Sequence, residues 1–496
     1  MNFVAFVLAV VAFVISVSFA PLVRMIALRL RLTDAPDGNR KVQKSPVALG
    51  GGVVVYLSLA LISSIIVLSP RAWELHLDET WADVWGFGGA CTLIVLVGLL
   101  DDCFGLRGRH KLIGQMIAAS CLIMSGLVVR NISLFGQSVD LGIMSIPFTM
   151  FWLLGAINAI NLLDGIDGLA TLVGIILTAT IGIMAAMTGN YGVAVIAAVL
   201  TGSLAGFLTY NLPPARMYLG DAGSMLIGLL VGAMAVRALL KTQGTLLLAA
   251  PMAIWAIPIL DSGAAILRRR LTGRSVYATD RGHLHHRLLQ ALGSNTAVLV
   301  IVGLCCVLTS GGALVAVWRE NDTYAVVPCL VVIGMLVVTG AFGRAELRLL
   351  VSRFWAIGTS LAHPTAVSGV RESSVRLQGS HRWDILWDTL TESAEKLKLC
   401  RVLLDVNAPA LHESYVATWE HADARVEPEN CWRLDLPLSI EDMRVGHLRV
   451  TGLARRDGRA CLGDIVQLLD LLDPFEVQMV SITAWVPKDE VVAGST

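Results

Sequence analysis

Asn158-Ala-Ile-Asn-Leu-Leu-Asp-Gly-Ile-Asp-Gly-Leu-Ala170 places four polar side chains at the end of an apolar run. Asn158, Asn161, Asp164 and Asp167 recur at every third position, so successive members lie near one another along a helix. An ionised aspartate at the centre of a bilayer costs about 2.5–3.5 kcal/mol. We therefore expect these aspartates at a membrane edge or in a wet cleft, in a functional role. The structural alternative is a plain helix C-terminus marked by Asn and Gly.

The composition identifies the class of protein. Of the 496 residues, 55% are hydrophobic and 15% are charged, whereas a soluble domain is about 45–50% apolar and about 25% charged. The chain is therefore an integral membrane protein. Apolar runs extend to about Phe342, and charge becomes denser beyond Arg371. The nine cysteines are an odd number and imply no disulfide framework.

The apolar runs predict an all-α polytopic membrane protein with eleven transmembrane helices. The first run lacks the basic start of a secretory signal, so we interpret it as a membrane span. The predicted spans are 1–23, 48–69, 85–100, 111–129, 146–163, 169–188, 192–210, 222–240, 245–266, 295–317 and 325–342. Lys and Arg are concentrated in alternate loops, which places the N-terminus outside and the C-terminus inside.

The predicted domains are a transmembrane domain over 1–350, a linker over 351–380 and a small cytoplasmic α+β domain over 381–496. In the last of these, apolar spacing predicts a helix from Trp383 to Leu397 and another from Leu462 to Leu472. Residues 402–406 and 432–436 have the pattern of strands. This domain has no pattern typical of a nucleotide or metal site, and its function stays open.

The polar motifs all fall on the predicted cytoplasmic side. They are Asp34 to Lys41, Asp101-Asp102 with Lys111, the stretch Asn158 to Ala170, Asn211 to Asp221, Asp261, and Asp280-Arg-Gly-His-Leu-His-His286. Carboxylates and amides near basic side chains suit Mg²⁺, which binds one or two carboxylates together with substrate phosphates. Three of these motifs have alternative interpretations. The Asp pair could be solvated surface, and Asp221 could belong to a plain helix N-cap. The histidines could form a zinc site, but no Cys or spaced His accompanies them, so a role in phosphate binding or proton handling is favoured.

Taken together, these motifs resemble the polyprenyl-phosphate N-acetylhexosamine-1-phosphate transferases, of the undecaprenyl-phosphate GlcNAc-1-phosphate transferase type in glycosyltransferase family 4. The resemblance covers about residues 20–295. It rests on Asp34-Ala-Pro-Asp-Gly-Asn-Arg-Lys-Val, Asp101-Asp102, Lys111-Leu-Ile-Gly-Gln115, Asn158 to Ala170, Asn211 to Ser224 and Arg281-Gly-His-Leu-His-His286. Gly38 is a one-residue departure from the family pattern in the first loop, and the C-terminal domain has no counterpart in short members.

The resemblance implies transfer of a sugar-1-phosphate, with GlcNAc expected, from a UDP-sugar to undecaprenyl phosphate, releasing UMP. Its expected cofactor is Mg²⁺, with Mn²⁺ as an alternative. Its product would start a lipid-linked cell-surface polysaccharide such as lipopolysaccharide at the bacterial inner membrane. By resemblance, Asp221 and Asn161 bind the metal. The expected catalytic residues are Asp101, Asp102, Asp164, Asp167 and His283, and the expected substrate-binding residues are Lys111, Asn158, Asn211, Arg281, His285 and His286.

Three other functions stay open at this point. An ion-coupled transporter would place polar groups near the middle of the membrane, whereas here they collect at one face. A related transferase could use another UDP-sugar. A catalytically inactive scaffold acting through its tail is disfavoured because every acidic motif is intact. The expected partners are the two substrates and the lipid bilayer, without nucleic acid; the oligomeric state is open, a homodimer included.

Overall fold

The structure is a computed structural model. It describes residues 2–34, 46–68, 81–135, 137–240, 245–247, 252–253, 255–271, 283–340, 342–343, 347, 351, 370–378, 382–397, 399–408, 413–421, 431–440, 443–453 and 458–470. The chain divides into two compact units. The first comprises Met1–Ile266 and His283–Phe342, and the second comprises Leu267–Gly282 and Gly343–Thr496.

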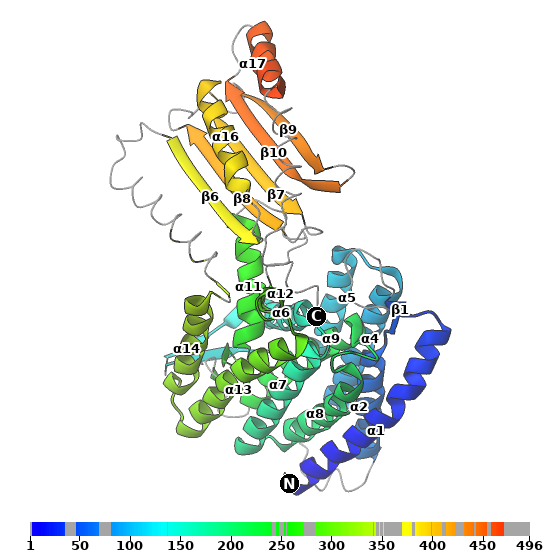
Figure 1. Cartoon of the computed structure of the whole chain (residues 1–496). Helices are drawn as coiled ribbons and strands as arrows, with labels where there is room; N and C mark the ends of the chain where they lie inside the picture. Colours follow the sequence, from blue (N-terminus) through cyan, green and yellow to red (C-terminus); the bar gives the residue numbers. More distant parts are fainter. Residues whose placement is uncertain are drawn as a thin grey trace. The chain divides into compact units, whose positions relative to one another are not determined.

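The first unit is helical, with its helices packed side by side (Figure 1). The helices are α1 (Asn2–Arg29), α2 (Gly51–Leu68), α4 (Trp81–Phe104), α5 (Gly108–Met124), α6 (Ser145–Leu163), α7 (Leu169–Met187), α8 (Tyr191–Asn211), α9 (Gly220–Leu240), α11 (Ala256–Leu271), α12 (Leu284–Leu292), α13 (Asn295–Arg319) and α14 (Thr323–Thr339). The residues of α11 from Leu267 onward belong to the second unit. Within the described ranges, eight helices are long and apolar enough to cross a membrane: α1, α2, α4, α6, α7, α8, α9 and α13. The protein is therefore a multi-pass membrane protein.

Three further helices lie where the remaining spans were predicted. These are α5, α11 and α14, with 17, 16 and 17 residues, shorter than the roughly 20 residues of a typical span. The span predicted over 245–266 differs most, because the strand β5 (Thr245–Leu247) occupies its start and α11 begins only at Ala256. A short apolar run fits a strand as well as a helix, since periodicity does not separate the two. The count of eleven spans stays a prediction.

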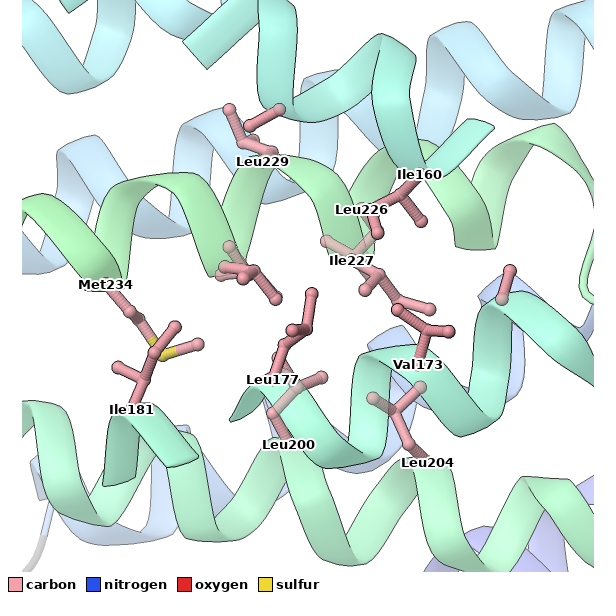
Figure 2. Packing of buried hydrophobic residues seen from close by; sticks show 14 of the residues in the cluster. Ile160, Val173, Leu177, Ile181, Leu200, Leu204, Leu226, Ile227, Leu229 and Met234 are labelled. Carbon is pink, nitrogen blue, oxygen red and sulfur yellow. The ribbon is translucent and has the colours of Figure 1, made fainter. Parts of the chain in front are cut away.

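Helix α9 lies at the centre of the first unit. It contacts α2, α4, α6, α7 and α8. Of the residues in its most apolar stretch, within Gly220–Ala238, 89% are buried. Figure 2 shows Met234 of α9 beside Ile181 of α7, and Leu177 of α7 close to Leu200 of α8. Because lipid is as apolar as these side chains, close van der Waals packing rather than transfer out of water holds such helices together.

Small residues bring two helices against the N-terminus of α9. A Cβ on Gly98 of α4 would lie 2.3 Å from the Cα of Ala222, and one on Gly52 of α2 would lie 2.2 Å from the backbone nitrogen of Gly223. Larger side chains at these positions would push the helices apart. The glycines therefore fix the start of α9 against α2 and α4.

The segment before α9 is held by the start of α2. The short strands β1 (Thr33–Asp34) and β2 (Val47–Ala48) pair antiparallel, and the Tyr218 N–H donates to the Ala48 carbonyl at 2.9 Å. In return, the N–H groups of Gly51 and Gly52 donate to the carbonyls of Tyr218 and Leu219. These bonds satisfy N–H groups at a helix start that have no partner within the helix.

A small sheet also belongs to the first unit. Its strands are β3 (Asn131–Leu134), β4 (Gln137–Asp140) and β5, in the order β4-β3-β5. β3 pairs antiparallel with β4 and parallel with β5. The short 3-10 helix η1 (Gly142–Met144) follows β4 and leads into α6.

The second unit contains a five-stranded antiparallel sheet in the order β6-β8-β7-β10-β9 (Figure 1). Its elements are β6 (Val370–Gln378), α16 (Trp383–Lys396), β7 (Arg401–Ala408), β8 (Glu413–His421), β9 (Cys431–Ile440), β10 (Met443–Leu453) and α17 (Gly458–Asp470). Helix α16 buries Trp383, Leu386 and Trp387 in the core of this unit. Strand β6 lies inside the stretch 351–380 that the sequence assigns to a linker, and it pairs with β8. Its Ser and Arg residues do not give the apolar pattern from which a strand is predicted.

Candidate active site

Asp221, the second residue of α9, contacts two other helices. Its Oδ2 lies 3.0 Å from the Nζ of Lys111 on α5, and its Oδ1 accepts a hydrogen bond from the Asn161 amide on α6. The same amide donates to the Ser224 hydroxyl at 2.9 Å. Gly220, at φ +74°, provides the left-handed turn before Asp221. The carboxylate is held in place but keeps 32% of its side-chain surface exposed.

The neighbouring residues Asp101 and Asp102 make different contacts. Asp101 Oδ2 forms a 2.7 Å ion pair with Lys111, and its Oδ1 accepts the Leu106 N–H at 2.7 Å. Asp102 accepts the N–H groups of Asp221 at 2.8 Å and of Ala222 at 3.3 Å. Asp102 therefore caps the positive N-terminus of α9 from the end of α4. Lys111, with 16% of its side chain exposed, bridges Asp101 and Asp221.

Asp164 and Asp167 follow the end of α6. Asp167 Oδ2 accepts the Ala215 N–H at 3.0 Å, which fixes the loop that leads to α9. Burial raises the pKa of Asp164 well above its usual value, and the charges of Asp221, Asp102 and Asp167 raise it further. The carboxylates are therefore close enough to repel one another.

Negative charge dominates this cluster, which we call the carboxylate cluster: Asp101, Asp102, Asp164, Asp167 and Asp221. In the described part of the chain, Lys111 is the one cationic side chain that forms an ion pair with a member of the cluster. Burial of like charges without a counter-charge is costly. The arrangement is therefore suited to binding a cation or a cationic group.

Asn158 and Asn211 are held by protein groups. Asn158 donates to the Gln115 side-chain carbonyl and to the Leu154 backbone carbonyl, both at 2.8 Å. Asn211 accepts from the Thr171 hydroxyl at 2.7 Å and donates to the Met217 carbonyl at 3.0 Å. These contacts join α5 to α6 and α7 to the end of α8, so both amides position the helices around the cluster.

The histidines form a second group beside the cluster. His283 Nδ1 lies 3.1 Å from Asp261 Oδ2, and Asp261 Oδ1 accepts the Leu284 N–H at 2.7 Å. A carboxylate on one ring nitrogen fixes the orientation of an imidazole. His285 stacks on His283 with ring centroids 5.7 Å apart.

His285 links this group to the cluster. A Cβ on Gly165 would lie 2.4 Å from His285 Nε2, so the turn after Asp164 approaches this ring closely. Burial lowers the pKa of His285 to about 3, and His286 and His283 contribute to the lowering. A neutral imidazole can bind a phosphate only by donating its N–H. His286 stacks obliquely on His285 with ring centroids 4.3 Å apart, and Arg281 lies outside the described residues.

Comparison with known proteins places this geometry in a family. Residues 84–239 match the family model of glycosyl transferase family 4. A probable undecaprenyl-phosphate N-acetylglucosaminyl 1-phosphate transferase of Bacillus subtilis is 32% identical over 301 residues, covering 59% of this chain and 80% of the relative. The chain belongs to glycosyl transferase family 4.

Other relatives of this family 4 protein have related names. A decaprenyl-phosphate N-acetylglucosaminephosphotransferase of Mycolicibacterium smegmatis is 31% identical over 342 residues, covering 64% of this chain and 83% of the relative. A phospho-N-acetylmuramoyl-pentapeptide-transferase of Caldanaerobacter subterraneus is 31% identical over 269 residues, covering 51% of this chain and 79% of the relative. These names bear out the family resemblance expected from the motifs.

The sequence also left part of the site of this family 4 protein unassigned. Gln115, Ser224 and Asp261 were not assigned roles, although the first two lie in quoted motifs and the third stood out as a charge near the end of a span. Tyr218 is a further case: burial raises its pKa to about 12, and the charges of Asp167 and Asp34 add to this. The motifs contain Gln115, Tyr218 and Ser224 without indicating their contacts, because those contacts depend on residues of other elements.

The predicted metal ligands fit a hard cation in part. Among the described residues, no group of three or more His, Cys, Asp or Glu is arranged to hold a metal ion by itself. Asp221 nevertheless offers a part-exposed carboxylate, and Asn161 uses its amide nitrogen toward Asp221 and Ser224, leaving the amide oxygen for another contact. One or two such oxygen ligands completed by substrate phosphates is the usual Mg²⁺ arrangement.

Proposed function

We propose that this family 4 protein transfers N-acetylglucosamine-1-phosphate from a UDP-sugar to undecaprenyl phosphate and releases UMP. The observation that carries the proposal is the Lys111 ammonium held between Asp101 and Asp221 at the ends of apolar helices, where it is the one described cation paired with the carboxylate cluster. The relatives named as polyprenyl-phosphate sugar-phosphate transferases support the same reaction. The chain is thus a sugar-1-phosphate transferase.

In this reaction an oxygen of the lipid phosphate attacks the phosphorus that is attached to the sugar. The new P–O bond gives polyprenyl-diphosphate-sugar, and the bond to UMP breaks, so UMP leaves with the electron pair. A lipid phosphate is already largely ionised at neutral pH and attacks without needing a base. The protein must therefore offset the repulsion between two anions and stabilise charge on the leaving UMP.

The described residues divide this task. Lys111 would bind a phosphate oxygen once a substrate competes for it with Asp101 and Asp221. Asp221 and Asn161 would hold Mg²⁺, which supplies charge neutralisation at the phosphates when bound. Asp102 keeps the start of α9 in place, and Asp261 orients His283, whose other ring nitrogen is left for substrate.

The sugar and the carrier are the finer part of the proposal. N-acetylglucosamine is chosen because two of the relatives carry it in their names, one with an undecaprenyl and one with a decaprenyl carrier. A second candidate is another UDP-sugar on the same scaffold, favoured by the relative named for a muramoyl-pentapeptide. The pathway served, such as lipopolysaccharide synthesis, follows from the sugar and acceptor that the enzyme accepts.

The decisive experiment measures UMP release by the purified full chain. Undecaprenyl phosphate, a panel of UDP-sugars and Mg²⁺ are supplied, and the same protein is assayed with a chelator. We expect UMP with UDP-N-acetylglucosamine and none with the chelator. A folded protein that releases no UMP from any sugar would overturn the function, whereas a different preferred sugar would revise the substrate alone.

We also propose eleven spans in the bacterial inner membrane, with the N-terminus outside and the C-terminus inside. The support is that the carboxylate cluster and the Arg-rich loops then share the cytoplasmic side. Reporter fusions at Asn190 and at the C-terminus should report outside and inside. The same side for both fusions would disprove this topology.

A further inference from the structure

A cavity of about 430 Å³ lies between α1 and α8 in the first unit. It is lined by Pro21, Arg24, Met25, Leu28, Arg29 and Tyr210. None of these residues lies on α4, α5, α6 or α9, the helices that carry Asp101, Lys111, Asn161 and Asp221. Tyr210 directly precedes Asn211, so the cavity is at the same end of the helices as the carboxylate cluster but on other elements.

Arg24 is anchored at the rim of the cavity. Its Nε donates to the Arg216 carbonyl at 3.1 Å, and the Arg216 N–H donates to the Tyr210 carbonyl at 2.8 Å. A guanidinium has five N–H donors, and the bond to Arg216 uses one of them. Because one nitrogen is fixed, the planar group loses less freedom when its remaining donors bind an anion.

The cavity combines positive charge with apolar surface. In the part of the chain that the structure describes, neither Arg24 nor Arg29 forms an ion pair with a carboxylate. Met25 and Leu28 are 43% and 42% exposed beside them. Guanidinium groups match phosphate geometry, and exposed apolar side chains at the end of a membrane helix contact glycerol and acyl groups.

We propose that this cavity binds the phosphate head group of an anionic phospholipid from the cytoplasmic leaflet. A volume of a few hundred Å³ suits a head group rather than a macromolecule. The two arginines bind the phosphate, and Met25 and Leu28 contact the start of the acyl chains. The bound lipid ties α1 to the loop after Tyr210, which leads to Asp221.

Native mass spectrometry of the full chain in neutral detergent tests this proposal. Phosphatidylglycerol, phosphatidylcholine and inorganic phosphate are titrated separately. We expect one phosphatidylglycerol to bind in preference to phosphatidylcholine, without displacement by inorganic phosphate. The double variant Arg24→Gln/Arg29→Gln should weaken this binding by about tenfold or more, because charge-assisted hydrogen bonds are lost.

Two variants and one control separate charge, shape and folding. The Arg29 side chain bonds to no other described residue, so Arg29→Gln alone should fold and still weaken binding. Leu28→Trp keeps both charges but fills the cavity, and should weaken binding as well. Arg31→Gln, at the same helix end but outside the cavity, should bind as the parent does.

Three results would overturn the proposal. Equal binding of phosphatidylcholine would remove the role of charge, and equal loss in Arg31→Gln would show general attraction to the helix end. Displacement by undecaprenyl phosphate, together with a raised KM for that lipid in Arg29→Gln, would assign the cavity to the acceptor substrate. Transferase activity is not needed for the lipid titration, so the result stands apart from the proposed reaction.

Discussion

Asp221 has both carboxylate oxygens in contact with other helices, through Lys111 and Asn161. Asp221→Asn keeps the size of the side chain and removes its charge, so it separates electrostatics from packing. We expect UMP release to fall by about 10²–10³-fold, because a group that stabilises transition-state charge is lost. Asp388→Asn, exposed on α16, is the matched control. Activity within threefold of the parent at saturating Mg²⁺ would reject the ligand assignment.

The raised pKa of Asp164 predicts a gain in stability when its charge is removed. The folded state binds the proton of the Asp164 carboxyl more tightly than the unfolded chain does. The stabilisation of the folded state by this protonated carboxyl is therefore complete below about pH 3.8 and is lost as pH rises through the raised pKa. Asp164→Asn cannot ionise, so the variant avoids this loss of stability at neutral pH. In metal-free detergent at neutral pH, its thermal midpoint should exceed that of the parent by about 2 °C or more.

The pH dependence provides the control for Asp164. The difference between variant and parent should shrink toward acid pH, where Asp164 is protonated in both states of the parent. Mg²⁺ should raise the midpoint of the parent by binding the folded state. A variant that unfolds at or below the parental midpoint at neutral pH would show that Asp164 is not strained by its neighbours.

Asp261 is predicted to position His283. It bonds both the His283 ring and the Leu284 N–H, so Asp261→Asn should reduce kcat by up to about 10²-fold through a misplaced imidazole. Ser262→Ala changes the adjacent residue, whose buried hydroxyl bonds to no described group, and should leave kcat unchanged. Equal rates for the two variants would remove the positioning role.

For single residues, the sequence predicted which side chains belong to the candidate site but not which groups they contact. Spacing and charge brought Asp101, Asp102, Lys111 and Asp221 to attention, and the structure brings them together. The bond from Asp102 to the start of α9 joins residues far apart in sequence, and no local pattern encodes it. The bond from Asn158 to Gln115 on another helix is also absent from any local pattern, and substrate binding by Asn158 stays a prediction.

At the scale of elements, the contact between α4 and α9 sets the geometry of the site. Gly98→Ala should force these helices apart, because the added Cβ would lie 2.3 Å from backbone atoms of Ala222. We expect a destabilisation of about 1–3 kcal/mol and reduced UMP release, since Asp102 and Asp221 would separate.

A second glycine on α4 provides the control for Gly98. A Cβ on Gly88 would meet nothing within 4 Å, so Gly88→Ala should be neutral or stabilising by up to about 1 kcal/mol. Thermal midpoints and rates of the two variants are compared. Indistinguishable midpoints would show that α4 and α9 can move apart without a loss of stability.

The helices themselves were largely predictable, since apolar length marks a span. Eight of the predicted spans contain helices that are long and apolar enough to cross a membrane, while α5, α11 and α14 are shorter than a typical span. The strands β5 and β6 were missed. β5 is apolar like a helix and is defined by pairing with β3, and β6 is polar and is defined by pairing with β8.

For the whole molecule, the division into two units predicts which part carries the chemistry. All members of the carboxylate cluster, Lys111, Asp261 and the histidines from His283 onward belong to the first unit. The family match over 84–239 lies within that unit as well. The second unit has its own buried core, which includes Trp383 and Trp419.

Deleting residues 370–496 should therefore leave transferase activity within about tenfold of the full chain. The cut precedes β6, so it removes the whole five-stranded sheet without splitting a strand pair. Trp383→Ala in the full chain is the companion variant: loss of this buried ring should cost the second unit about 3–5 kcal/mol while the chain keeps its length. UMP release and membrane level are measured for both. If the folded, truncated chain is inert while Trp383→Ala stays active, the second unit contributes a group to the reaction and the chemistry is not confined to the first unit.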